Sequence, residues 1–188
     1  MPWIRSKLLP FVVLCAVFTA ARADATVVVP LTREELVHRA DLIVRASVGT
    51  QRSMWNENHT QIITLTTLTV TAAWKGNAPQ TLTLRQFGGT VGELTSRVAG
   101  DSQLRRGQDA IFFLRQGSGV VYLTALAQSV YTVSTRDGTP RVARDLAGLT
   151  FARVDNAGPM QLIDATSERS ESLSSFVADL ARLLGGAR

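Results

Sequence analysis

The chain has 188 residues, of which 45% are hydrophobic, 6% aromatic and 19% charged, and its formal net charge is +5. This length suits one domain with a sizeable core. Arg5, Lys7 and Arg22 lie near the start, and without them the chain has 17 basic residues against 15 acidic ones. So small an excess argues against a nucleic-acid-binding surface.

The first 23 residues have the organisation of a secretory signal peptide. A basic start precedes the apolar run Leu8–Ala20, and Ala21-Arg22-Ala23 is a small-x-small cleavage site. The run is shorter than the roughly 20 apolar residues of a membrane span. We therefore expect a signal peptide over 1–23 and a single domain over 24–188, with Ala23-Asp24-Ala25 as the alternative cleavage site.

The leader also determines the expected compartment and chemistry of the mature protein. Export places it in the periplasm or outside the cell. Cys15, the sole cysteine, lies inside the leader, so we expect no disulfide, no cysteine metal ligand and stability from core packing alone. No second apolar run approaches the length of a membrane span, so no span is expected in the mature chain.

The first half of the mature chain is predicted to form one helix followed by strands. After an extended lead at residues 26–30, Thr32 and Glu35 form a T-x-x-E capping box, which predicts a short helix ending near Ala40. The β-branched and threonine-rich segments that follow predict strands over 41–50, 61–74 and 81–87. Residues 51–59 are polar and are predicted to be a loop, and the glycines after Phe87 predict an irregular segment.

The second half has one strongly apolar strand and a terminal helix. Ala110–Leu114 is a continuous apolar run, which predicts a central strand buried on both faces. Further strands are expected over 120–126, 129–134, 148–154 and 160–163. From Leu173 to Leu184 apolar residues form one helical stripe, capped by Ser170 or Ser172 and ended by Gly185. We expect this stripe to cover the barrel rather than to dock a partner helix.

These elements predict a fold class. About seven to nine short strands separated by turns, with a helix at either end, indicate a mainly β protein. The expected architecture is an antiparallel OB-like β-barrel, or a sandwich, with a short N-terminal helix and a C-terminal amphipathic helix.

Signs of catalysis or metal binding are weak. No serine lies in a G-x-S-x-G elbow. His38 and His59 are 21 residues apart and have no H-x-x-x-H partner, and Asp137 and Asp145 lack the dense oxygen spacing of a calcium loop. We predict no catalytic residue, no cofactor and no metal site, which leaves a hydrolase of unrecognised type as the least favoured function.

Three sets of residues are candidates for binding a partner. Trp55 and His59 fall in the predicted polar loop, where an exposed aromatic side chain can anchor a partner. A bend or a ligand loop is expected at the glycines after Phe87, and the bend is favoured because no Lys-Ser/Thr follows. The third set consists of three arginines, which are expected to form a small cationic rim near the glycines or to be ordinary solvated loop charges. The glycines are Gly88, Gly89 and Gly92, and the cations are Arg97, Arg105 and Arg106.

Several short motifs suggest a family. They are H-R-A-D at 38–41, L-I-V-R-A-S-V at 42–48, W-K-G at 74–76, R-R-G-Q-D-A-I-F-F-L at 105–114 and the G-S-G hairpin at 117–119. Over residues 35–134 this order resembles that of uncharacterised secreted bacterial proteins. More distantly it resembles the tissue inhibitors of metalloproteinases and netrin-type modules, which are OB-fold barrels.

The resemblance implies a barrel that presents loops at its ends. Those inhibitors chelate zinc with an N-terminal cysteine, which the mature chain lacks, so no functional residue carries over. We expect an exported, noncatalytic binding module of unknown partner, for instance an exported protease, acting through loops near Trp55 and 88–92. The alternative is an envelope-associated structural accessory protein that uses the C-terminal stripe for assembly.

Overall fold

The computed structural model describes residues 26–147, 149–153, 161–165 and 168–186. The proposed leader, including Cys15, lies outside the described residues. Within them the chain is mainly β, with thirteen strands and two α-helices. All eight predicted strands are present near their expected places, and the five additional strands are short segments of two to six residues, too short to give a clear periodicity in the sequence.

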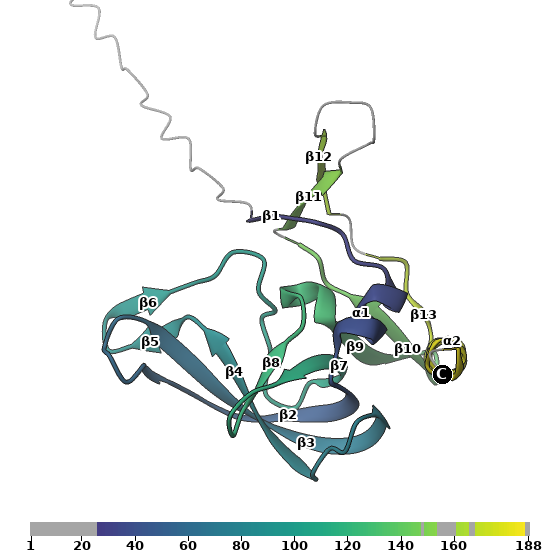
Figure 1. The fold of residues 1–188 in the computed structure, drawn as a ribbon, viewed down its shortest axis with the longest axis horizontal. Helices are drawn as coiled ribbons and strands as arrows, with labels where there is room; N and C mark the ends of the chain where they lie inside the picture. The colour runs from purple at the N-terminus through teal and green to yellow at the C-terminus, as the bar shows by residue number, and fades with distance from the viewer. Residues whose placement is uncertain (1–25, 148, 154–160, 166–167, 187–188) are drawn as a thin grey trace, which may run out of the picture.

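Five strands close into a barrel (Figure 1). Its strands are β2 (Leu42–Trp55), β3 (Ile62–Lys75), β4 (Thr81–Phe87), β7 (Asp109–Gln116) and β8 (Val121–Leu123). They are arranged in the order β7-β2-β3-β4-β8, and β8 pairs with β7 to close the ring. All neighbours are antiparallel except β4 and β8, which pair in parallel. The predicted antiparallel barrel with flanking helices is therefore confirmed.

The β2–β3 hairpin is longer than the sequence indicates. Residues 51–55, predicted to be loop, form the last part of β2, because Gln51 pairs with Thr66 and Ser53 with Thr64. A register irregularity between Val48 and Gln51 separates this part from the apolar part of the strand. The prediction of a loop was wrong because it rested on the polarity of these residues. In the structure the polar residues of this part of β2 pair with polar residues of β3.

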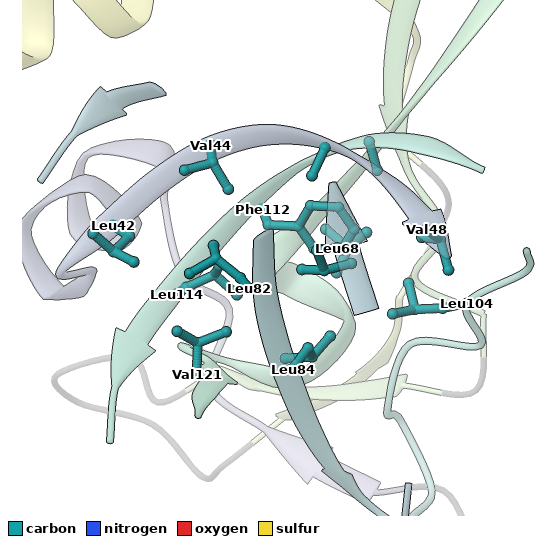
Figure 2. Packing of buried hydrophobic residues seen from close by; sticks show 13 residues of the cluster. Leu42, Val44, Val48, Leu68, Leu82, Leu84, Leu104, Phe112, Leu114 and Val121 are labelled. Atoms are coloured by element: carbon teal, nitrogen blue, oxygen red, sulfur yellow. The ribbon is translucent and has the colours of Figure 1, made fainter. Parts of the chain in front are cut away.

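The interior of the barrel is apolar at its centre. The strand β7 alternates, so that Ala110, Phe112 and Leu114 face inward while Ile111 and Phe113 face outward, and all five are fully buried. The continuous apolar run is thus explained by burial on both faces, as predicted. Figure 2 shows Phe112 and Leu68 near the middle of the inner cluster.

A second core covers the outer face of the sheet. The strand β7 also pairs with β9 (Val130–Arg136), which continues through β10 (Thr139–Arg144) to β13 (Glu171–Ser172). The helices α1 (Arg33–Arg39) and α2 (Leu173–Gly185) pack on this sheet. Thr32 and Glu35 form the predicted capping box, and Ser172 caps α2.

The C-terminal stripe belongs to this second core. Phe176 and Leu180 are fully buried, and Leu173, Leu183 and Leu184 pack against the same cluster. The helix therefore covers the protein's own sheet, as expected. Among the described residues no helix is both long and apolar enough to cross a membrane.

Two smaller sheets complete the fold. The first consists of β5 (Gly89–Val91) and β6 (Leu94–Ser96), a hairpin where an irregular segment was predicted. The second places β11 (Leu149–Arg153) between β1 (Thr26–Val28) and β12 (Gln161–Asp164), and a 3-10 turn (Leu126–Ser129) precedes β9. In Figure 1 the β5–β6 hairpin and α2 lie at opposite sides of the molecule.

Candidate functional site

At one end of the barrel the inward-facing side chains change from apolar to polar. Alternation along β3 puts Thr64 and Thr66 on the same side as the core residue Leu68. From β2, the Ser53 hydroxyl lies 2.9 Å from the Thr64 hydroxyl, and Gln51 Nε2 lies 3.4 Å from Thr66 Oγ1. We call this polar end of the barrel the mouth.

The glycines after β4 let the chain cross the mouth at close range. Gly88 and Gly89 have φ values of 93° and 129°, which favour glycine. A Cβ on Gly89 would lie 2.3 Å from Ser53 Oγ and 2.4 Å from Thr64 Oγ1. The Gly88 N–H donates to the Ile62 carbonyl at 2.8 Å, and Thr64 Oγ1 donates to the Gly88 carbonyl at 2.7 Å. These glycines are required for the bend itself.

A hollow of about 310 Å³ lies between the mouth and the crossing segment, and we call it the polar hollow. Its walls come from β2, β3, β4, the β5–β6 hairpin and residues 97–104. Neutral hydroxyl and amide side chains dominate the lining, with one cation, Arg97, and one acid, Asp101. Gln86 Nε2 donates to the Ser102 carbonyl at 2.9 Å, which ties the far wall to β4.

Asp101 is the acid that lines the polar hollow. Burial raises the pKa of its carboxyl above the usual value, although hydrogen bonds from the Ser102 N–H and from Gln86 act in the opposite direction. The Ser102 N–H lies 2.8 Å from Asp101 Oδ1. The fold therefore holds a carboxyl group at a position that disfavours its charge.

An apolar hollow of about 340 Å³ adjoins the polar one, and five residues line both: Phe87, Gly88, Thr95, Ser96 and Val98. The apolar side chains on its walls are Trp55, Ile62, Phe87, Leu94 and Val98. Phe87 and Leu94 are 49% and 59% exposed, and both line this hollow. This apolar hollow and its exposed rim form a contiguous surface beside the mouth.

Trp55 and His59 are placed differently from the prediction of a shared loop tip. Trp55 is the last residue of β2, pairs with Ile62 and is half-buried in the apolar hollow. His59 lies exposed in the connecting turn with φ 53°, and its N–H donates to the Asn56 carbonyl at 2.9 Å. The difference arises because the paired strands extend through residues 51–55.

The remaining candidates are spread over different places. Gly92 lies in the β5–β6 turn, where a Cβ would meet nothing within 4 Å. Arg97 lines the polar hollow, whereas Arg105 lines a second cleft of about 550 Å³ on the other side of residues 101–103. Arg106 is exposed in the turn that follows. The structure thus brings Trp55, Gly88, Gly89 and Arg97 to the two hollows and leaves His59, Gly92, Arg105 and Arg106 outside them.

Several residues that line the two hollows at the mouth were not predicted from the sequence. They are Gln51, Ser53, Thr64, Gln86, Leu94 and Asp101. A usable signal exists in β3, where Thr64 and Thr66 continue the face of Leu68, because polar residues at the end of an inward face indicate an open end of the barrel. Within the part of the chain that the structure describes, no three His, Cys, Asp or Glu side chains gather as a metal site.

Comparison with known proteins found no relative. No protein-family model, no curated protein and no solved structure matches this chain.

Proposed function

We propose that the protein is an exported, noncatalytic binding module that holds its partner at the mouth of the barrel. The observation that carries this proposal is the exposed apolar rim of Phe87 and Leu94 beside the half-buried Trp55. Exposed apolar side chains that gather around a hollow are typical of interaction sites. Aromatic side chains in such a surface give large contact area at low entropic cost.

The strand order supports the resemblance on which part of the proposal rests. Three antiparallel strands followed by a crossover, with one parallel contact between β4 and β8, form a five-stranded Greek-key barrel. This is the arrangement of OB-type barrels, which bind ligands on strands and loops near one end. Fold analogy alone does not identify a function, so the proposal depends on the surface chemistry of the mouth.

The chemistry of the polar hollow favours binding over reaction. General acid–base catalysis uses paired titratable groups within reach of a substrate. Asp101 is the one acid among the described residues that line the polar hollow, and no histidine lines it. We propose that the partner is a protein, for instance an exported protease, and that it contacts the apolar rim.

The experiment compares two leucines of similar exposure. The tagged, exported protein is used to capture partners from the exported fraction of its host, alongside Leu94→Ala and Leu162→Ala. Leu162 on β12 is 57% exposed against 59% for Leu94, but it does not line the apolar hollow. The proposal predicts that a partner is retained by the Leu162→Ala variant and lost from the Leu94→Ala variant. Equal retention by both variants would refute the mouth as the binding surface.

A further inference from the structure

We infer that the polar hollow is a binding site for a neutral saccharide. This inference goes beyond the proposed protein partner, because it rests on the polar lining of the mouth, to which the apolar rim adds only Phe87 at the border. The hollow presents hydroxyl and amide groups from three barrel strands and from the β5–β6 hairpin, among them Gln51, Ser53, Thr64, Gln86, Thr90 and Ser96. Such groups match a ligand that carries many hydroxyls and no charge.

The charge of the hollow supports an uncharged ligand. Arg97 and Asp101 are the charged residues of its lining, and they have opposite signs. Burial raises the pKa of the Asp101 carboxyl, so an isolated charge is disfavoured at that position. A phosphate or carboxylate ligand would need cationic groups that converge on it, whereas the described lining has one arginine, which is exposed.

The hydrogen-bonding groups are held in place before any ligand arrives. The hydroxyls of Thr90 and Thr95 lie 2.9 Å apart, and the hydroxyls of Ser53 and Thr64 lie at the same distance. The Thr64 hydroxyl donates to the Gly88 carbonyl and the Ser53 hydroxyl therefore donates to Thr64, so this pair keeps acceptor positions only. The Thr90–Thr95 pair keeps one donor as well as acceptor positions. Groups that are already ordered lose little conformational entropy on binding.

Size and an aromatic neighbour also fit a sugar. About 310 Å³ lies at the lower end of the range for small-molecule sites. Phe87 lines both hollows and is 49% exposed, with the guanidinium carbon of Arg85 6.0 Å from the centre of its ring, so one aromatic residue borders the polar hollow. The apolar C–H face of a sugar ring can pack on an aromatic face while its hydroxyls reach the polar wall.

Titration followed by amide NMR tests this inference on the mature protein. The probes are maltotriose, cellotriose and N-acetylated chitotriose, with trialanine as the peptide arm. We expect at least one trisaccharide to shift the amide signals of residues 86–103 in a saturable manner below 10 mM, and trialanine to leave them unchanged. No shift with any trisaccharide at 10 mM would overturn the inference, and so would a saturable response to trialanine alone.

Two variants locate the site and one serves as the control. Gln86→Leu removes an amide of the wall, and Ser96→Ala removes an exposed hydroxyl without disturbing a strand of the barrel. Each is expected to weaken saccharide binding roughly two- to tenfold. Thr69→Ala removes a comparable hydroxyl on an exposed position of β3 outside the hollow and should leave Kd unchanged. Equal Kd values for Ser96→Ala and Thr69→Ala would contradict the site, whatever the outcome of the leucine comparison.

Discussion

The guanidinium carbon of Arg33 lies 4.3 Å from the centre of the Phe176 ring, so the first helix is tied directly to the last one. Arg33 Nη1 also donates to Asp179 Oδ2 at 2.7 Å, and its Nη2 forms an ion pair with Glu171. One arginine of α1 thus holds both β13 and α2 against the sheet. The side chain is 19% exposed, so these contacts are largely screened from water.

Replacing Arg33 should therefore loosen the C-terminal segment. Arg33→Ala is expected to lower the free energy of unfolding by about 2–3 kcal/mol, because two carboxylates lose a charged hydrogen-bond partner. Arg182→Ala is the control, since Arg182 also binds Asp179 but is 71% exposed, and it should cost less than about 1 kcal/mol. Urea unfolding of both variants measures the difference, and equal losses would contradict the role of Arg33.

The stability contributed by Asp179 should depend on pH. Hydrogen bonds from Arg182 and Arg33 lower the pKa of the Asp179 carboxyl in the folded protein. A lowered pKa adds stability that is complete above the unfolded-state value of about 3.9 and is lost as pH falls below it. Asp179→Asn should therefore be less stable than wild type at pH 7 and should approach it near pH 3. A stability difference that stays constant with pH would argue against this linkage.

Asp101 should behave in the opposite way. Burial raises the pKa of this carboxyl, so its charged form costs stability at neutral pH, and the cost disappears as pH falls below the unfolded-state value. Asn can still accept the Ser102 N–H bond. We expect Asp101→Asn to be more stable than wild type at pH 7 and equal to it near pH 3, as measured by urea unfolding at the two pH values. A loss of stability at pH 7 would show that the charge itself supports the mouth.

Gly89 should be intolerant of any side chain. A Cβ there would lie within 2.4 Å of two hydroxyl oxygens, at a φ of 129°. Gly89→Ala is expected to lower the free energy of unfolding by about 2 kcal/mol or more, through strain and displacement of the hairpin. Gly92→Ala has φ 59° and open space around the Cβ, so its cost should be about 1 kcal/mol. Thermal or urea unfolding measures the two losses of stability. Similar losses for Gly89→Ala and Gly92→Ala would contradict the close approach at Gly89.

Much of the framework follows from local sequence patterns. The capping box of Thr32 and Glu35 and the run Ala110–Leu114 each determine an element without help from distant residues. The tight turn at Gly117–Gly119 likewise connects paired strands where expected. Local propensity and burial point to the same answer at these positions.

The mouth depends instead on contacts between distant segments. Gln51, Gln86 and Asp101 look like ordinary polar residues in the sequence, and they meet only after the barrel closes. The irregular register between Val48 and Gln51 decides which side of β2 faces inward there, and a one-residue shift reverses that choice. A polar segment that forms a strand because its partner is equally polar has no apolar periodicity to reveal it.

Hydrogen–deuterium exchange with a captured partner tests the central proposal most directly. In the complex, the amides of residues 55–62 and 87–98 should exchange more slowly than in the free protein, while those of α2 and β12 should be unchanged. Slower exchange confined to α2 or β12, with the mouth unaffected, would contradict the account.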